Sequence, residues 1–290
     1  MLVPGGSVYA CDAGEGDALL CLHGGPGASH GYLTYGLRAL ASTFRPIFFD
    51  QRGGGRSVTT GAGRPSFRDL LDDIESLCEA YRLERLGLVG HSWGALLALS
   101  YALVTRREVT GVALVNALPL GSDLLTTLFE FIFARTEDAR VTRRLSRVEA
   151  TLAASGAVQR ERAVAFAHQT VPLFVRTKNW SRLPQYEAPV DWQMEIWSAA
   201  QQHVQRNRRA LPSVLVVQGE EDVATADDVA RSLGDIGQAR AVTIPHCGHV
   251  APLEAPRELC GVLRRYFERG ASARGPRFSA SSSEPRCESP

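Results

Sequence analysis

Short, uninterrupted apolar runs recur along the chain and alternate with stretches of helical periodicity. The apolar runs span residues 18–22, 47–49, 86–89, 112–115, 214–217 and 241–244, and the helical stretches span 67–81, 93–104, 226–233 and 254–267. Continuous rather than alternating apolar runs are typical of parallel strands that are covered by helices on both faces. The pattern therefore predicts an α/β fold with a mostly parallel sheet.

This alternation stops between about residues 118 and 211. Strand-like runs are replaced there by arginine-rich helical patterns, such as those over 124–135 and 140–154. We expect a helical cap over 119–211, inserted into an α/β core formed by 1–118 and 212–268. The final stretch, 269–290, is poor in apolar residues and rich in Ser, Pro, Gly and Arg, which predicts a disordered tail.

The charge balance narrows the classes of partner. The 290 residues carry a formal net charge of +1, which gives no electrostatic reason to expect nucleic acid or a membrane surface as a partner. The first residues resemble no secretory signal, and no apolar run is long enough to span a bilayer. The sequence thus predicts a soluble, cytoplasmic protein, and it leaves open both chemistry on a small molecule or short peptide and the formation of a homo-oligomer.

The six cysteines are scattered without CxxC spacing, which favours reduced thiols over a disulfide framework. The segment His246-Cys247-Gly248-His249 resembles a metal site, but no second ligand cluster stands at zinc spacing from it. We therefore expect no bound metal.

The pentapeptide Gly90-His91-Ser92-Trp93-Gly94 lies between an expected strand and an expected helix. A serine at such a junction needs a very tight turn, and glycines two residues to either side remove side chains that would clash there. This context predicts that Ser92 is a nucleophile.

A serine hydroxyl is a weak nucleophile unless a base removes its proton and a third group orients that base. Asp222 follows the strand expected at 214–217, and it is the candidate orienting acid, with Glu220 and Glu221 as alternatives in the same loop. His249 follows the strand expected at 241–244 and is the candidate base, with His246 as the alternative. His91 is too close to Ser92 in sequence to serve as its base.

Acyl transfer also requires hydrogen-bond donors for a tetrahedral oxyanion. The candidates are the backbone N–H of Trp93, directly after the nucleophile, and that of Gly25 in the run His23-Gly24-Gly25-Pro26-Gly27. No dinucleotide-binding fingerprint follows the first strand, so we expect no cofactor. Asp50 and Arg52 are expected to form a charge-assisted pair that ties loops together beneath the site.

Together, HGGPG at 23–27, DQRGGGRS at 50–57 and GHSWGA at 90–95, followed by Asp222 and His249, resemble the α/β-hydrolase superfamily and most closely its proline iminopeptidase branch. The chain departs from that branch at Gly54, His91 and Ala95, where the branch typically carries serine, glycine and serine. The resemblance implies an eight-stranded, mostly parallel sheet with a helical lid after the sixth strand.

In proline iminopeptidases the lid supplies glutamates that bind the free amino terminus of the substrate. Glu187 and Glu195 are the nearest candidates for this role, although no lid motif matches. Trp192, with Met194 and Trp197, would line an apolar substrate pocket or belong to the core.

The combined expectation is a cofactor-free serine hydrolase that forms an acyl-enzyme and cleaves an N-terminal residue as proline iminopeptidases do. The alternative is a carboxylesterase or lactonase acting on small-molecule esters, since the same residues open any activated acyl bond. A third class is a small-molecule receptor without turnover. An epoxide hydrolase or dehalogenase would need an aspartate where Ser92 stands.

Overall fold

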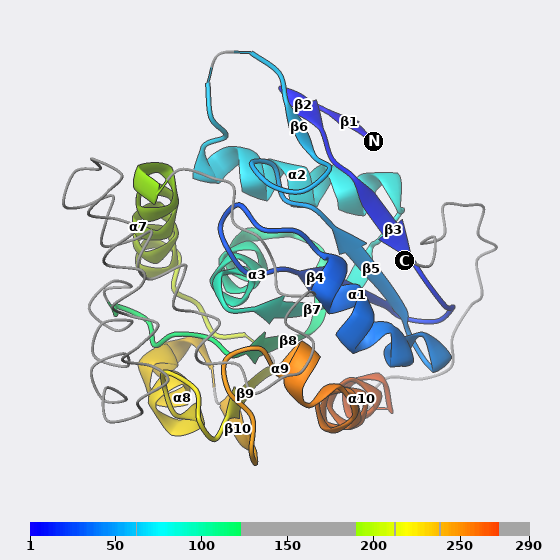
Figure 1. Ribbon diagram of the computed structural model, residues 1–290, viewed down its shortest axis with the longest axis vertical. Coiled ribbons are helices and arrows are strands. Elements are labelled where there is room, and N and C mark those ends of the chain that lie inside the picture. Colours follow the sequence, from blue (N-terminus) through cyan, green and yellow to red (C-terminus); the bar gives the residue numbers. More distant parts are fainter. Residues whose placement is uncertain (62, 123–189, 212, 238, 273–290) are drawn as a thin grey trace, which may run out of the picture.

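The computed structural model describes residues 1–61, 63–122, 190–211, 213–237 and 239–272. Within these ranges the main sheet has seven strands in the order β10-β9-β8-β7-β4-β5-β3 (Figure 1). Neighbouring strands are parallel except for β3, which runs antiparallel to β5 at one edge. The strands are β3 (Ala10–Asp12), β4 (Ala18–Leu22), β5 (Arg45–Phe49), β7 (Arg85–His91), β8 (Glu108–Val115), β9 (Val214–Gly219) and β10 (Ala239–Ile244).

A second, small antiparallel sheet is formed by β1 (Leu2–Val3), β2 (Gly6–Ser7) and β6 (Val58–Thr59). The chain reverses between β1 and β2 at Gly5, whose φ of +79° suits glycine. These strands pair with one another rather than extending the main sheet. The described main sheet therefore has one strand fewer than the eight expected.

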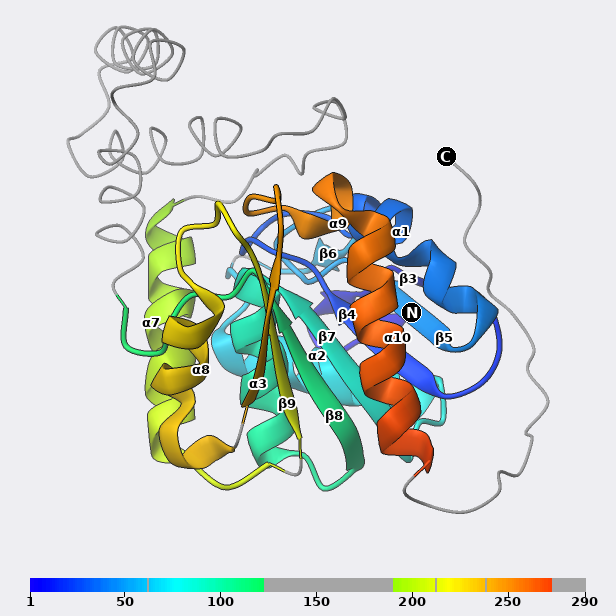
Figure 2. The same ribbon diagram turned by 90° about the horizontal axis from the view of Figure 1, so that it is seen from below.

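Helices cover both faces of the main sheet, as Figure 2 shows. One face carries α2 (Phe67–Ala80), α3 (Trp93–Val104) and α8 (Ala226–Leu233), followed by a 3-10 turn, η4 (Gly234–Ile236). The other carries α1 (Gly31–Leu37), the 3-10 helix η1 (Arg38–Ser42), α9 (Ala251–Glu254) and α10 (Pro256–Ser272). Because side chains alternate along a strand, β4 contributes Leu20 and Leu22 to one core, and Leu19 and Cys21 to the other. This double coverage confirms the α/β prediction.

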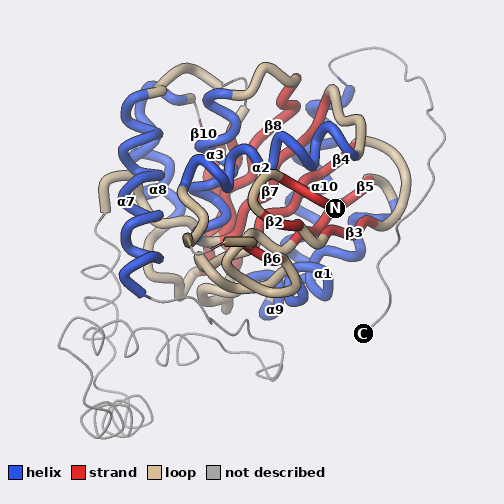
Figure 3. The backbone as a smooth tube through the Cα atoms, turned by 90° about the horizontal axis from the view of Figure 1, so that it is seen from above, coloured by secondary structure: helices blue, strands red, loops and turns tan. Residues whose placement is uncertain are grey.

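Helix α7 (Val190–Arg206), at the left of Figure 3, packs against α3 and also contacts α2. Its residues Ile196, Ala200 and Val204 are buried in the same core as α3. The residues of α7 fall within the range expected to form the cap, yet this helix packs as a layer of the core. The remainder of the expected cap, residues 123–189, lies outside the described residues.

Each of the six apolar runs lies within a strand, and the four helical stretches correspond to α2, α3, α8 and the α9–α10 region. Helix α10 continues to Ser272, beyond the expected core boundary at 268, and the rest of the expected tail lies outside the described ranges. None of the helices in the described part of the chain is long and apolar enough to cross a membrane.

Four of the cysteines, Cys21, Cys78, Cys247 and Cys260, are buried free thiols, as the expectation of reduced thiols predicts for them.

Candidate active site

Ser92 occupies a strained turn between the end of β7 and the start of α3. Its φ of +53° and ψ of −119° are rarely adopted by residues with a side chain. A Cβ at Gly90 would lie 2.2 Å from the Gly94 carbonyl oxygen, and one at Gly94 would lie 2.2 Å from that of Leu22. Both glycines are thus required for the close approach that presents the Ser92 side chain at the edge of the sheet.

Ser92, His249 and Asp222 are joined by hydrogen bonds. His249 Nε2 lies 3.0 Å from Ser92 Oγ, and His249 Nδ1 lies 2.7 Å from Asp222 Oδ1. A carboxylate can only accept, so Nδ1 carries the proton and Nε2 is left to accept the serine hydroxyl proton. Asp222 and His249 follow the neighbouring parallel strands β9 and β10, whose carboxyl ends meet at the same edge as that of β7.

The local charges favour a proton on His249. Burial of the ring lowers its pKa, but the charge and hydrogen bond of Asp222, together with the charge of Glu254, outweigh burial and raise the pKa of His249 above its ordinary value. Glu254 accepts hydrogen bonds from the amides of Gly248 and Val250, so it also holds the loop that carries the histidine. The imidazolium form is therefore stabilised at this position.

Asn116 holds Asp222 and the loop that carries His249 in place, although no sequence motif identified it. It follows β8 with a φ of +49°, and its Nδ2 donates to Asp222 Oδ2 at 2.7 Å and to the Gly248 carbonyl at 3.0 Å. Its Oδ1 accepts from the Ala251 amide at 3.1 Å. A polar residue immediately after the apolar run at 112–115 was the available signal.

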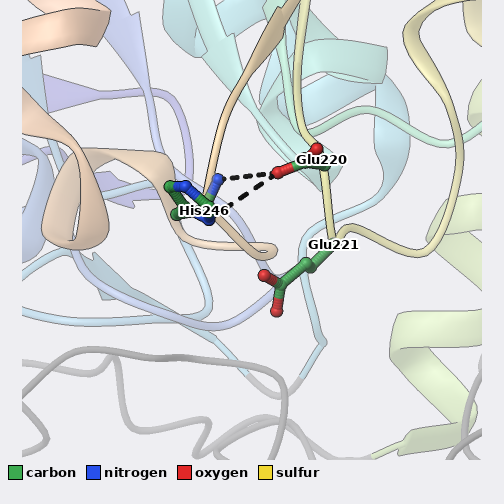
Figure 4. A group of neighbouring side chains, drawn as sticks. All are labelled: Glu220, Glu221 and His246. Carbon is green, nitrogen blue, oxygen red and sulfur yellow. Dashed lines mark hydrogen bonds and ion pairs between the residues drawn. The ribbon is translucent and has the colours of Figure 1, made fainter.

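The alternative acids and base gather elsewhere on the same two loops. Glu220, Glu221 and His246 offer ligand atoms within 4.8 Å of one another, as Figure 4 shows. Such oxygen and nitrogen atoms are ligand types for divalent metals. However, Glu220 and His246 are exposed, and the Glu220 carboxylate already accepts the His246 amide at 3.0 Å and lies 3.9 Å from His246 Nδ1. We interpret the group as a surface ion pair.

The glycine-rich loop after β4 faces the Ser92 turn. The Gly24 amide donates to the Tyr32 hydroxyl at 2.7 Å, so it is already engaged. Within the described part of the chain, the amides of Gly25 and Trp93 have no hydrogen-bond partner. These two N–H groups are therefore available to a ligand.

His23 and Gln51 fix this loop from beneath. The Gln51 amide donates to His23 Nε2 at 2.9 Å, so the proton of this ring lies on Nδ1, which is 2.7 Å from the Gly24 carbonyl. Gln51 also connects the His23 carbonyl, at 2.8 Å, to the Trp93 indole N–H, at 2.7 Å. Burial lowers the pKa of His23 to about 4, so the ring is neutral.

The expected pair between Asp50 and Arg52 is wrong. Asp50 Oδ1 accepts from the backbone N and from Nδ1 of His30, at 2.8 and 2.7 Å, and Oδ2 accepts the Arg56 amide at 2.8 Å. Arg52 instead donates to Asp73 on α2 at 2.6 Å. Asp50 therefore connects this loop to His30 at the start of α1, whereas Arg52 connects it to α2.

An apolar pocket opens beside Ser92 between α3, α7 and α8. It is lined by Ser92, Ala95, Leu96, Leu99, Leu114, Ala117, Leu118, Leu120, Trp197, Gln201, Val229, Ser232 and Leu233. Trp197 thus contributes to the pocket.

Trp192 and Glu195 are not among the described residues that line this pocket. Trp192 is buried and donates to the Pro65 carbonyl at 2.7 Å, and Glu195 lies on the exposed face of α7. Glu187 lies outside the described residues.

The chain is similar to known proteins both in sequence and in fold. A family model described as the alpha/beta hydrolase fold matches residues 17–256. A putative proline iminopeptidase of Mycoplasma pneumoniae is 39% identical over 124 residues, which are 41% of this chain and 39% of that protein. A proline iminopeptidase of Heyndrickxia coagulans is 35% identical over 105 residues, 34% of each chain. The matched segments thus span little more than a third of these relatives.

Solved structures are similar over almost the whole chain. The crystal structure of a proline iminopeptidase from Mycobacterium smegmatis has a TM-score of 0.63 at 19% identity, over 92% of this chain and 96% of that one. An esterase from Exiguobacterium antarcticum has a TM-score of 0.61 at 19% identity, over 92% and 97%. At these identities the similarity shows the fold alone.

Proposed function

Because the chain belongs to the α/β-hydrolase fold family, we propose that it is a serine hydrolase with Ser92 as nucleophile, His249 as general base and Asp222 as orienting acid. The observation that carries the proposal is the hydrogen-bonded series from Ser92 Oγ to His249 Nε2, at 3.0 Å, and from His249 Nδ1 to Asp222 Oδ1, at 2.7 Å. The strained turn at Ser92 supports it further, since strain of this kind is maintained mainly at functional positions.

The reaction follows from this geometry. Ser92 Oγ attacks the substrate carbonyl carbon as its proton passes to His249 Nε2, and Asp222 stabilises the resulting imidazolium. The amides of Gly25 and Trp93 donate to the oxyanion of the tetrahedral intermediate, and each such donor is worth about 3 kcal/mol of barrier in characterised enzymes. His249 then protonates the leaving group, which departs and leaves an acyl-enzyme. Water, deprotonated by His249, attacks the ester and regenerates Ser92.

For the substrate, we favour cleavage of an N-terminal residue from a short peptide or small amide, as in proline iminopeptidases. The motifs HGGPG and DQRG support this choice, as do the relatives of that name at 35–39% identity.

A carboxylesterase or lactonase is the second candidate, favoured by a different observation. Among the described residues, those that line the pocket beside Ser92 include no carboxylate that could pair with a substrate ammonium group. An uncharged acyl chain suits such a lining better than a charged amino terminus does.

A substrate panel tests both candidates. Proline β-naphthylamide, its N-acetylated form and short p-nitrophenyl esters should be compared with wild type and with Ser92→Ala. Strong preference for the free amine supports the peptidase, whereas cleavage of esters alone supports the esterase. If wild type were as inert as Ser92→Ala on every substrate while both bound ligand, a receptor without turnover would replace the proposal.

The amine-binding residue can be sought by the same assay. If the free amine is preferred, Glu187→Gln or Glu195→Gln should raise KM for proline β-naphthylamide while leaving ester cleavage unchanged. Equal kinetics for both variants and wild type would exclude the two glutamates from this role.

A further inference from the structure

His91, the residue directly before Ser92, is hydrogen-bonded through both ring nitrogens. Nδ1 lies 2.7 Å from the Tyr32 hydroxyl oxygen on α1, and Nε2 lies 2.8 Å from the backbone oxygen of His249. The same Tyr32 oxygen accepts the Gly24 amide at 2.7 Å. A continuous series of three hydrogen bonds thus connects the glycine-rich loop, the Ser92 turn and the His249 loop.

The direction of each hydrogen bond in this series is determined by its two ends. The His249 carbonyl can only accept, so His91 Nε2 carries the proton and Nδ1 is the acceptor. Tyr32 therefore donates its hydroxyl proton to Nδ1 and accepts the Gly24 N–H with its lone pair. A protonated His91 would have donors at both nitrogens, and the bond from Tyr32 would be lost.

The surroundings keep His91 neutral. Its side chain is buried, and burial, followed by the proximity of His249, lowers the pKa of His91 to about 3. The rings of His91 and His249 are 5.6 Å apart. The positive charge that develops during proposed catalysis is thereby confined to His249, while His91 remains neutral and keeps both hydrogen bonds well above this pKa.

Gly24 is closely packed against the side chains that form this junction. A Cβ at Gly24 would lie 3.0 Å from His91 Nδ1, 3.2 Å from the Tyr32 oxygen and 3.3 Å from Ser92 Cβ. The rings of Tyr32 and His91 meet edge to face with centroids 5.2 Å apart. Gly24 is adjacent to Gly25, so displacement of Tyr32 or His91 would move a proposed oxyanion donor.

We propose that His91, together with Tyr32, is a positioning residue: it holds the Gly25 loop and the His249 loop in register on either side of Ser92. This inference rests on the proposed serine hydrolysis and adds to it a role for His91, one of the three positions at which the chain departs from the proline iminopeptidase pattern. His91 acts through the two loops and does not take up the Ser92 proton.

Two substitutions separate the halves of the series. In His91→Gln, the side-chain amide can still donate toward the His249 carbonyl but offers no acceptor at the Nδ1 position. In His91→Asn, the carbonyl oxygen can still accept from Tyr32, but the donor to His249 is lost. Tyr32→Phe removes only the hydroxyl, and Tyr101→Phe is a matched control, because the Tyr101 hydroxyl bonds to Glu75 at 2.6 Å, far along α3 from Ser92.

The readout is the rate at which a fluorophosphonate labels Ser92, followed by mass spectrometry. In this step Ser92 Oγ bonds to phosphorus, fluoride departs, and His249 takes up the serine proton. It requires the nucleophile, base and oxyanion donors but no particular substrate. We expect Tyr32→Phe and both His91 variants to label about 10–100-fold more slowly per folded molecule, since small displacements of reacting groups have effects of this size. Tyr101→Phe should label at the wild-type rate.

The double variant Tyr32→Phe/His91→Gln supplies the decisive comparison. Because both changes interrupt the same bond, it should label no more slowly than the slower single variant. Additive losses, or rates that fall only in proportion to the folded fraction, would overturn the positioning role. If wild type is labelled at Ser92 yet cleaves no panel substrate, the proposed reaction fails while the labelling series still decides the role of His91. No labelling of wild type would overturn both.

Discussion

Asn116 donates to Asp222 at 2.7 Å through the same amide nitrogen that bonds the Gly248 carbonyl at 3.0 Å. One buried side chain thus holds the second oxygen of the proposed orienting acid and the residue that precedes the proposed base. The other oxygen, Asp222 Oδ1, accepts from His249 Nδ1 and from the Val223 amide, each at 2.7 Å, so both oxygens of the carboxylate are held in a fixed orientation.

Asn116→Gly should lower kcat by about 10–100-fold with little change in KM, because the Asp222–His249 pair loses its support. Glycine tolerates the φ of +49° at this position, so the variant removes the contacts without adding backbone strain. The unpaired Asp222 oxygen should also lower the free energy of unfolding by about 1–3 kcal/mol. Steady-state kinetics and urea denaturation measure the two effects, with Asn207→Gly as the control. An unchanged kcat would contradict the assignment.

The pH dependence of kcat/KM should report His249. The base must be neutral to accept the serine proton, so activity should rise with pH through the pKa of His249, which the Asp222 carboxylate raises above 6.5. Glu254→Gln removes a nearby negative charge and should shift this acid limb to lower pH. Glu258→Gln serves as the control. If the acid limb of the kcat/KM profile has the same midpoint in Glu254→Gln as in wild type, the proposed electrostatic effect of Glu254 is wrong.

The raised pKa of His249 also makes stability depend on pH, but in the direction opposite to activity: the contribution of His249 to stability falls as the pH rises. A histidine with a raised pKa binds its proton more tightly in the folded state, so its stabilisation is complete below about pH 6.5 and is lost as pH rises through the folded-state pKa. Comparing the urea midpoints of wild type and His249→Gln between pH 5 and 9 should show their difference shrinking as pH rises. A constant difference would indicate that His249 does not titrate in this range.

Ser92→Gly and Ser92→Ala should both lose activity, yet they should differ in stability. Glycine relieves the φ of +53°, whereas alanine retains its cost, which is about 1–3 kcal/mol for such conformations. Ser92→Gly should therefore unfold at a higher denaturant concentration than Ser92→Ala. Equal midpoints would show that the turn is not strained.

Asp50→Asn should destabilise the fold without altering the chemistry. Burial raises the pKa of Asp50, but the hydrogen bonds and charge of His30 and the Arg56 amide outweigh burial and lower the pKa overall. The ionised Asp50 therefore stabilises the fold at pH values above the ordinary pKa of an aspartate, and this stabilisation is lost as the pH falls through the lowered pKa. Replacing it should cost about 1–3 kcal/mol at neutral pH. Asp72→Asn, in an exposed pair with Arg68, should have no measurable effect. A large fall in kcat for Asp50→Asn would instead indicate a direct role.

The parts of the molecule that could be predicted are those encoded locally. The apolar runs identified the parallel strands, and the residues that follow strands β7, β9 and β10 identified Ser92, Asp222 and His249 in advance of their contacts. Tyr32 and Asn116 act through contacts with residues distant in sequence, which no local pattern records. The wrong Asp50–Arg52 pair has the same origin, because proximity in sequence does not determine which helix each side chain reaches.

The segment 123–189 is inserted between two anchored ends. Leu118 and Leu120 before it, and Trp197 after it, line the pocket beside Ser92. Ser92, Asp222 and His249, by contrast, are attached to strands of the sheet that lie outside this insertion in sequence. The sequence between 123 and 189 can therefore change in length or composition without altering the strands that carry these three residues or the hydrogen bonds among them.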